Sequence, residues 1–493
     1  MSQVKTVQNA LEQIGELPSH MWIEGQRISI GSRQKIETCD PGSGTILATV
    51  PAGTVDDVDH AVAVAKAALK GPWADMMPKE RGKFLWKAGE AIHAQIDRFA
   101  LVETLDSGKP LKDAKVSVQR AADYFMYYAG MVDKLEGTTI PLGSNKIAYT
   151  EKVPVGVTGH IVPWNVPLSM VTRGIAPALA CGNTAVVKPA EDTPLSAIMV
   201  AELLEEIGLP VGVVNVVTGF GAEAGQALTE HPDVRHITFT GSVATGKKIM
   251  HAAADHLASV TLELGGKSPH LILNDADLDR ATPDIMAAVY KNAGQICSSG
   301  TRLIVEKDIH NQLVDRLAKT SEAMRVGHGL SDPDMGPLIS NRQLRSVVSF
   351  TVRAKERGVE FACGGSAISI SGNEGGHFFA PSVADKIDPS DELAQKEIFG
   401  PVLSVIPVGS VNEAIEVANN TDYGLAAGIH TRDINAAIRF AKSVEAGQVY
   451  INGYHGSGDT VPFGGFRDSG IGREKGLAGL DAYSATRAVT ISL

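Results

Sequence analysis

The first third of the chain alternates apolar and polar positions mainly at helical spacing. Apolar side chains recur every three or four residues, with Lys, Asp and Glu between them, over residues 56–69, 78–94, 99–107 and 114–131. This period places the apolar side chains on one face of a helix. Residues 20–60 instead contain short strand-like runs separated by turn residues. We therefore predict short strands followed by four amphipathic helices.

From residue 155 onward, short apolar runs alternate with helical segments. The predicted strands cover 157–162, 184–188, 213–217, 236–240 and 261–264, and the predicted helices cover 168–181, 194–207, 222–229 and 246–254. Residues 277–456 repeat the alternation, with helices near 278–293, 310–323, 341–357, 411–419 and 434–445 and strands near 303–306, 402–407, 426–430 and 448–451. This order is typical of parallel sheets covered by helices. We predict an α/β fold with two doubly wound, Rossmann-like domains.

Two β-prone segments fit neither domain. Residues 137–153 resemble a strand pair that projects from the helical region, and the chain finishes in an uncharged, β-prone strip over 483–493. A lone hairpin is only marginally stable, and an unpaired strand edge attracts another chain. We therefore predict an arm that finds its partner on another subunit.

Length, charge and cysteine usage narrow the class of protein. A chain of 493 residues is too long for one hydrophobic core. Its 45 Lys and Arg against 56 Asp and Glu give a net charge of −11, which argues against nucleic acid or an anionic membrane as partner. No apolar stretch has the length of a membrane span. The four cysteines lie far apart, without metal-site spacing, so we expect no metal and a reducing, cytoplasmic compartment.

Cys297 is the first candidate for chemistry. It lies among small residues between a predicted helix and a predicted strand, and Gly294 and Gly300 flank it. A thiol on such a turn can be approached closely by a ligand. Most free cysteines are small buried hydrophobic residues, so both a nucleophile and a packing role are open at this point.

Polar residues at the ends of two predicted strands could assist a nucleophile. Asn165 follows the strand 157–162, and its side-chain amide could donate to a developing oxyanion. Glu263 lies at the end of the strand 261–264, beside two glycines. A partly desolvated carboxylate in a mobile surrounding is suited to act as a general base.

Other strand ends offer features of a nucleotide site. Glycine-bearing turns at 219–225 and 240–246 each lead into a predicted helix, whose N-terminus could bind a phosphate. Lys188 and Glu191 follow the strand 184–188, where a ribose would lie. A carboxylate there would accept hydrogen bonds from ribose hydroxyls and repel a 2′-phosphate, which favours NAD over NADP. A solvated Lys–Glu pair is the alternative.

Taken in order, these motifs resemble the aldehyde dehydrogenase superfamily over essentially the whole chain. The matching runs are Pro163-Trp164-Asn165, Lys188-Pro189-Ala190-Glu191, Phe239-Thr240-Gly241-Ser242, Glu263-Leu264-Gly265-Gly266-Lys267, Gly294-Gln295-Ile296-Cys297, Glu397-Ile398-Phe399-Gly400-Pro401 and Pro462-Phe463-Gly464-Gly465. The resemblance implies NAD-dependent oxidation of a small-molecule aldehyde to the carboxylic acid. Cys297 would form a thiohemiacetal and then a thioester, Asn165 would hold the oxyanion, and Glu263 would activate water.

The resemblance also assigns cofactor residues and domains. The implied NAD-binding residues are Ile161, Trp164, Lys188, Glu191, Gly221, Gly225, Gly241, Ser242, Glu397 and Phe399. Residues 1–131 and 154–263 would form the NAD-binding domain, 264–462 the catalytic domain, and 132–153 with 475–493 an oligomerisation arm. The arm and the C-terminal strip would pair between subunits, giving a dimer or a dimer of dimers.

The chain departs from the family pattern in its substrate tunnel. Many members carry Trp-Lys where this chain has Arg173-Gly174, so a proton relay through Glu474 is in doubt. Arg173 could bind the carboxylate of a semialdehyde or make a structural salt bridge, and an aromatic aldehyde is also compatible. Met170 and His455 are the other candidate substrate residues. A CoA-acylating semialdehyde dehydrogenase and an inactive binding or structural protein are the rival functions.

Overall fold

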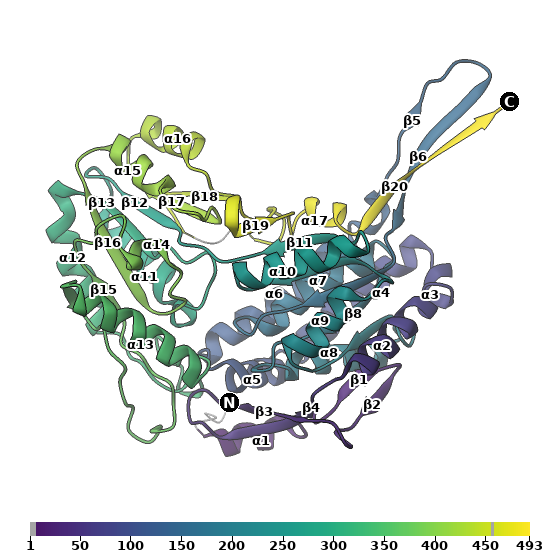
Figure 1. The fold of residues 1–493 in the computed structure, drawn as a ribbon, viewed down its shortest axis with the longest axis horizontal. Coiled ribbons are helices and arrows are strands. Elements are labelled where there is room, and N and C mark those ends of the chain that lie inside the picture. The colour runs from purple at the N-terminus through teal and green to yellow at the C-terminus, as the bar shows by residue number, and fades with distance from the viewer. Residues whose placement is uncertain (1–5, 455–457) are drawn as a thin grey trace.

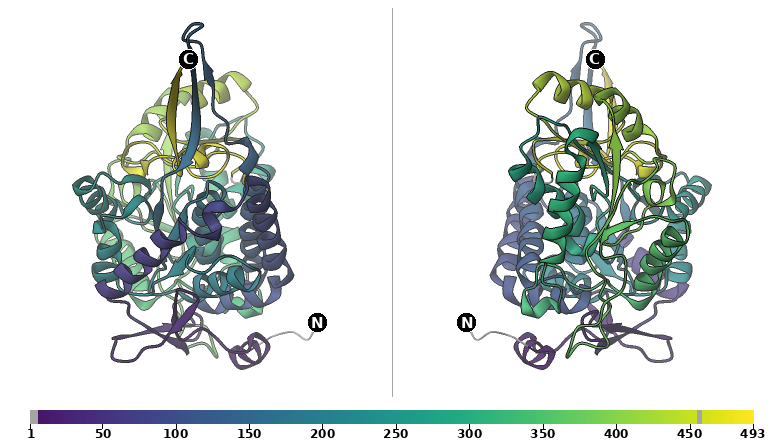
Figure 2. Two further views of the ribbon diagram at one scale, coloured as in Figure 1. Left: turned by 90° about the vertical axis from the view of Figure 1, so that its right-hand side faces the viewer. Right: turned by 90° about the vertical axis from the view of Figure 1, so that its left-hand side faces the viewer.

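The computed structural model describes residues 6–454 and 458–493, and two large sheets flanked by helices dominate it (Figure 1). A thin arm projects from the side of the first sheet, and helix α1 (Val7–Ile14) lies at the opposite end of the molecule (Figure 2). The predicted α/β class is therefore confirmed. In the described residues, no helix combines the length and the apolar character needed to cross a membrane.

The first sheet has a parallel core in which the strand order reverses. Its order is β19-β11-β10-β7-β8-β9-β1-β2. The parallel strands are β7 (Val157–Ile161), β8 (Thr184–Lys188), β9 (Val214–Val216), β10 (Val234–Thr240) and β11 (Ser259–Glu263), and the antiparallel edges are β1 (Met21–Ile23), β2 (Gln26–Ile28) and β19 (Gly470–Ile471). The chain leaves β7 toward β8 on one side, and β10 returns to its other side. Ligands of open α/β sheets bind at the carboxyl ends of strands at such a reversal.

Helices cover this sheet on both faces, and most of them lie where the apolar pattern predicts. They are α2 (Val55–Ala68), α4 (Pro78–Ala94), α5 (Ile96–Ser107), α6 (Leu111–Ala129), α7 (Pro167–Ala180), α8 (Leu195–Glu206) and α10 (Val243–Asp255). Every residue of α7 is buried. The predicted helix 222–229 is wrong in detail, because the glycine-bearing segment Gly221–Gly225 forms one wide π-helical turn before the short α9 (Gln226–Glu230).

The second sheet is parallel except at one edge. Its order is β14-β15-β16-β13-β12-β17-β18. The strands are β12 (Pro269–Ile272), β13 (Arg302–Glu306), β14 (Phe361–Cys363), β15 (Ser382–Ala384), β16 (Val402–Val408), β17 (Ala426–His430) and β18 (Gln448–Ile451). The larger helices beside them are α11 (Leu278–Tyr290), α12 (Lys307–Glu322), α13 (Asn341–Glu356), α15 (Val411–Asn419) and α16 (Ile434–Ser443). The pattern missed β12, β14 and β15, which have only three or four residues each.

The arm is a three-stranded antiparallel sheet formed within one chain. It contains β5 (Thr139–Ile140), β6 (Lys146–Pro154) and β20 (Ser484–Ser492). β20 pairs with β6 along its whole length, from Ser484 opposite Pro154 to Ser492 opposite Lys146. The expectation that these two segments pair between subunits is therefore wrong, because the C-terminal strip satisfies its backbone on the arm of its own chain.

Candidate active site

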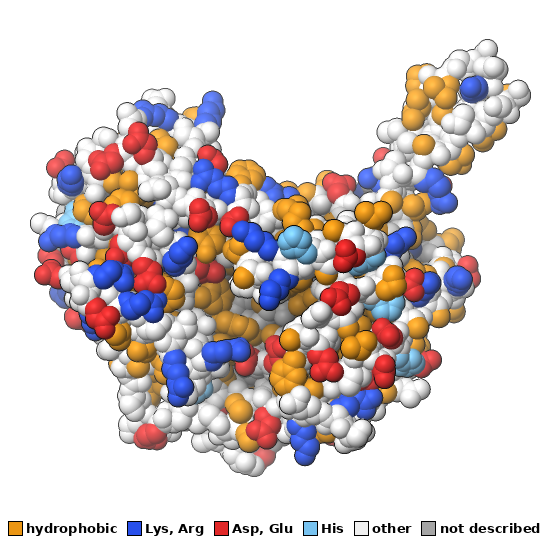
Figure 3. Space-filling model, viewed as in Figure 1, with side chains coloured by type: hydrophobic (Ala, Val, Ile, Leu, Met, Phe, Trp, Pro, Cys, Tyr) orange, Lys and Arg blue, Asp and Glu red, His pale blue; other side chains and the backbone are white. Residues whose placement is uncertain are grey.

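A cavity of about 420 Å³ lies where the strand order of the first sheet reverses. Residues that follow β7, β10 and β11 form one wall, and the loop carrying Cys297 faces them. The space-filling view shows a hollow between the two halves of the molecule with hydrophobic side chains at its bottom (Figure 3). Both sheets therefore contribute residues to one site.

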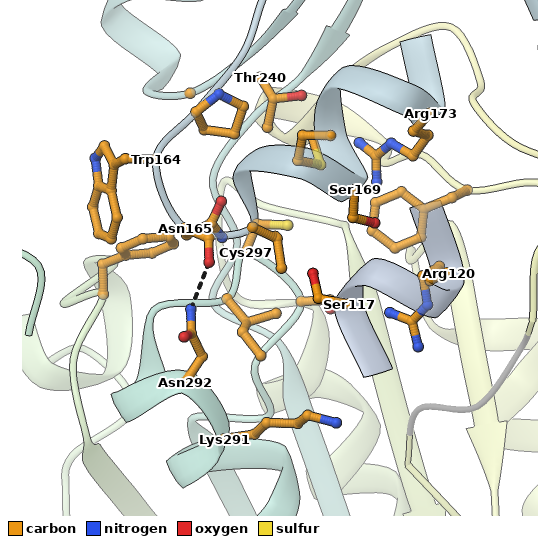
Figure 4. Close-up of a pocket in the computed structure, with 18 of the residues that line it drawn as sticks. Ser117, Arg120, Trp164, Asn165, Ser169, Arg173, Thr240, Lys291, Asn292 and Cys297 are labelled. Carbon is orange, nitrogen blue, oxygen red and sulfur yellow. Dashed lines mark hydrogen bonds between the residues drawn. The ribbon is translucent and has the colours of Figure 1, made fainter. Parts of the chain in front are cut away.

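A left-handed turn presents Cys297 to this cavity. Helix α11 ends at Tyr290, and Asn292, Ala293 and Gly294 then adopt φ angles of 52°, 55° and 74°. Such angles are strained for residues with a Cβ atom. A Cβ atom on Gly294 would lie 2.2 Å from the carbonyl oxygen of Gly400, so glycine is required there. The predicted helix over 278–293 is thus too long, and the turn that replaces its end positions the thiol (Figure 4).

The surroundings of Cys297 favour the neutral thiol. Burial, together with the carboxylates Glu263 and Glu397, raises the pKa of Cys297 to about 12. Arg173 opposes them by favouring the thiolate. The sulfur is therefore a protonated, protected group in this state, and it becomes a nucleophile when its proton is removed.

Asn165 lies beside Cys297 with an unused amide hydrogen. Its Nδ2 donates to the carbonyl oxygen of Gln295 at 2.8 Å, and its backbone oxygen accepts from Nδ2 of Asn292 at 3.0 Å (Figure 4). A side-chain amide has two hydrogens, and one of them has no partner among the described residues. Asn165 can therefore donate to an oxyanion that forms next to the sulfur.

Glu263 is held behind the cavity wall. Its side chain is buried at the end of β11, its carboxylate oxygens have no hydrogen-bond partner among the described residues, and it does not line the cavity. Burial and the neighbouring Glu474 raise its pKa well above the usual value, while Arg173, Arg473 and Lys475 oppose this. The predicted base thus lies close to the site, and its carboxylate would need a side-chain rotation to reach it.

Arg173 faces the cavity from α7 but is already paired. Its guanidinium forms a buried ion pair with Glu474 and lies 5.3 Å from the centre of the Phe463 ring. Thr238 donates to the other carboxylate oxygen of Glu474 at 3.1 Å. Of the two roles considered for Arg173, the geometry matches the salt bridge. A Cβ atom on Gly174 would lie 2.6 Å from Nδ1 of His160, so the His160 ring occupies the space that a lysine would need.

Of the other two candidate substrate residues, the structure describes only one. Met170 is buried and lines the cavity. His455 lies outside the described residues.

Five of the predicted cofactor residues line the same cavity. They are Trp164, Gly241, Ser242, Glu397 and Phe399. The rings of Trp164 and Phe399 meet edge to face with centroids 5.2 Å apart. Glu397 accepts a hydrogen bond from the backbone N–H of Gly266 at 3.1 Å, and burial raises its pKa to about 7. Ser242 is the N-cap residue of α10, so the N-terminal N–H groups of that helix face this end of the site.

The remaining cofactor residues form a second group at the ends of β7, β8 and β9. Glu191 lies 3.2 Å from Lys188 and accepts from the backbone N–H of Gly221 at 2.6 Å. A Cβ atom on Gly225 would lie 3.8 Å from Lys188, and Ile161 pairs with Lys188 in the sheet. Although burial raises the pKa of Glu191, Lys188 and the backbone N–H groups lower it below its usual value. This ionised, glycine-bordered cradle and the cavity together suit a dinucleotide.

Sequence reasoning missed most of the cavity wall that α6 supplies. Asp113, Val116, Ser117, Arg120 and Tyr124 all line the cavity. They are spaced by three, one, three and four residues, which places them on one face of the helix. This row of polar and apolar residues on one helix face is the sequence pattern from which the α6 wall could have been predicted. Lys475 also lines the cavity, but no such spacing in the sequence around it indicates that position.

Comparison with known proteins agrees with this geometry. The sequence model described as the aldehyde dehydrogenase family matches residues 28–489. An aldehyde dehydrogenase of Emericella nidulans is 40% identical over 476 residues, which cover 96% of this chain and 95% of that protein. The structure of an aldehyde dehydrogenase from Bacillus cereus in complex with NAD+ has a TM-score of 0.95, 40% identity and 98% coverage of both chains. Betaine aldehyde dehydrogenase from Staphylococcus aureus, also in complex with NAD+, has a TM-score of 0.96, 35% identity, and coverage of 98% of this chain and 97% of its own. The chain therefore belongs to the aldehyde dehydrogenase family.

Proposed function

We propose that the chain oxidises an aldehyde to the carboxylic acid, with NAD as hydride acceptor and Cys297 as nucleophile. The observation that carries the proposal is the meeting of the Cys297 thiol and the Asn165 amide in one cavity at the strand-order reversal. A soft nucleophile beside an oxyanion donor is the arrangement that covalent aldehyde oxidation needs.

In the first step, the sulfur of Cys297 attacks the carbonyl carbon. A C–S bond forms, and the π electrons of the carbonyl group move to its oxygen. The free hydrogen of Asn165 Nδ2 donates to that oxygen, and the family resemblance adds the backbone N–H of Cys297. Because burial favours the neutral thiol, the S–H bond breaks as the C–S bond forms and its proton passes to water, and the fixed charge of Arg173 favours that loss.

Cofactor residues then orient the second step. A bound NAD would supply the acceptor for the hydride that leaves the former carbonyl carbon. Trp164, Phe399 and Glu397 would hold that end, and Ser242 at the start of α10 would lie beside the pyrophosphate. As the hydride leaves, the oxyanion electron pair reforms the C=O bond, and Cys297 carries a thioester.

Glu263 would act in the third step by removing a proton from water. The water oxygen attacks the thioester, the C–S bond breaks, and the carboxylic acid leaves while the sulfur regains a proton. A raised pKa makes the ionised carboxylate a stronger base. A water-activating base would waste the intermediate in a CoA-acylating enzyme, so hydrolysis is the favoured outcome.

Glu191 supports NAD rather than NADP. Its carboxylate is ionised and fixed between Lys188 and Gly221 at the end of β8. A second negative charge from a 2′-phosphate would be repelled there.

We further propose that the two sheets divide the work. Residues 1–131 and 154–263 would bind NAD, residues 264–462 would carry the catalytic thiol, and the arm of 132–153 with 475–493 would dock on another subunit in a dimer or a dimer of dimers. The exposed side chains of Ile147, Tyr149 and Ile491 on the arm support such docking.

The test is NADH formation from an aldehyde panel, with product analysis in the presence and absence of CoA. We expect the free acid as product, loss of activity in Cys297→Ala, and retained activity in Cys363→Ala, which removes a buried cysteine on β14. Acyl-CoA as the product would favour the acylating rival. NADH formation from no member of the panel would favour an inactive binding protein.

A further inference from the structure

Two cations at one end of the cavity have no ion-pair partner within the described residues. Lys475 extends over the Phe463 ring at 5.4 Å and donates to the carbonyl oxygen of Gly458 at 2.9 Å. Arg120 is exposed on the cavity face of α6. Neither side chain forms an ion pair within 4.0 Å of a described carboxylate oxygen, whereas Arg173 pairs with Glu474.

The negative charges around Lys475 and Arg120 do not fully balance these two cations. Burial, together with Arg173 and Arg120, lowers the pKa of Lys475 to about 8, although Asp459 and Glu474 oppose this change. Glu474 is committed to Arg173 and Thr238. Burial raises the pKa of Asp459, while Lys475 and Arg120 lower it, so this one carboxylate faces both cations. A ligand carboxylate between Lys475 and Arg120 would pair with both cations and would favour the charged form of Lys475, which burial disfavours.

The cavity wall contains both apolar and polar side chains. Tyr124, Met170 and Phe463 belong to its apolar part, and Figure 4 places Ser117 and Ser169 between Cys297 and the two arginines. Figure 4 places Arg120 and Arg173 on the same side of Cys297, on two different helices. A ligand that reached from the sulfur to the cations would therefore have a reactive group, an apolar spacer and an acidic end.

We propose that Lys475 and Arg120 form an anion subsite that binds the carboxylate of an aldehyde whose carbonyl group lies at Cys297. The inference rests on the proposed function and names its substrate class, an aldehyde acid with an apolar or aromatic spacer. Arg173, fixed by Glu474, supports the subsite through its charge rather than by direct binding.

Matched aldehydes that differ in one charge test the subsite. The pairs are 4-carboxybenzaldehyde with 4-methylbenzaldehyde, and succinate semialdehyde with butanal. In Lys475→Met and in Arg120→Met, we expect KM for the acidic member to rise about 10-fold or more, the loss expected for one charge-assisted hydrogen bond, and KM for the neutral member to stay within about 2-fold. Lys115→Met is the control, because it removes a positive charge from the outer side of α6, where Lys115 pairs with Asp97.

The pH dependence of KM provides a second readout. Lysine is a cation below its pKa, so KM of the wild type for 4-carboxybenzaldehyde should rise above about pH 8, and this rise should disappear in Lys475→Met. Equal changes for acidic and neutral aldehydes would overturn the subsite. Failure of the wild type to oxidise either member of a pair would instead overturn the proposed function.

Discussion

At the scale of single residues, the fixed positive charge of Arg173 acts on several groups whose neutral forms are favoured by burial. Burial raises the pKa of Cys297, Glu263 and Glu397. Arg173 opposes these increases for the thiol and for Glu263. The guanidinium of Arg173 stays charged because Glu474 raises the pKa of Arg173, although burial lowers it. A guanidinium suits this role because it keeps its proton under all ordinary conditions. Compared with the Trp-Lys pair of many family members, the Arg173-Gly174 pair therefore moves the positive charge by one position and does not remove it.

Replacement of Arg173 should move the titration of the thiol. A nearby cation stabilises the thiolate, so Arg173→Leu should raise the pKa of Cys297 further and shift the pH at which iodoacetamide labels it upward by about one unit or more. Arg173→Lys keeps the charge and should shift it much less. Arg173→Leu also leaves Glu474 buried without its partner, at a cost of about 3–5 kcal/mol, so Arg173→Leu with Glu474→Gln is the folding control. An unchanged labelling profile in a folded Arg173→Leu enzyme would limit Arg173 to a structural role.

At the scale of elements, short connections rather than helices and strands position the chemistry. Asn165 follows β7, Glu263 ends β11, and Cys297 follows the left-handed turn after α11. Helix α7 is held at its start by Glu103 of α5, which accepts from the backbone N–H of Leu168 at 3.4 Å and pairs with Lys109 at 2.6 Å. The elements form a rigid frame, and the turns at their ends carry the reactive groups.

Gly294→Ala should damage the site far more than an ordinary glycine replacement. The new Cβ atom would meet the carbonyl oxygen of Gly400 at 2.2 Å, so the turn must move and carry Cys297 with it. We expect kcat to fall by about 10²-fold, the cost of displacing a reacting group by roughly 1 Å. Gly358→Ala is the matched control, because Gly358 has a similar φ of 83° with nothing within 4 Å of the added Cβ atom. It should cost about 1 kcal/mol of unfolding free energy and leave kcat unchanged. Equal kcat values in the two variants would contradict the role of the turn.

The elements also show how far the sequence could lead. Apolar periodicity located α4, β8 and α15 at their observed bounds, because each of them buries a regular set of side chains. It could not locate β12 or β15, where three or four residues carry too little pattern. Motif order brought Cys297 and Asn165 together correctly. The pairing of Arg173 with Glu474 was beyond prediction, because it joins two distant segments of the chain through side-chain geometry alone. The placement of Lys475 in the cavity depends on the path of that same C-terminal segment.

At the scale of the whole molecule, the chain crosses between its two sheets to close the cavity. The last part of the chain returns to the first sheet, where Gly470 and Ile471 of β19 pair with Glu263 and Leu262 of β11. This return places Phe463, Glu474 and Lys475 beside residues of α6 and α7. Neither half alone would hold the complete site, so the two sheets must keep a fixed relation for the cavity to exist.

We expect the arm to bind other copies of the chain. β5, β6 and β20 project from the body and carry apolar side chains into the solvent (Figures 1 and 3), and Ile147, Tyr149 and Ile491 are 44%, 37% and 44% exposed. A three-stranded ribbon with little hydrophobic backing gains stability by docking on a larger surface. Ile147→Asp with Ile491→Asp should therefore lower the molar mass measured by light scattering toward that of one chain, 51.9 kDa. Val352→Asp is the control, because Val352 is 46% exposed on α13, away from the arm. If the doubly substituted chain keeps the mass of the wild type, the arm does not hold subunits together. If the mass falls and NADH formation falls with it, docking of the arm also keeps the two sheets in their working relation.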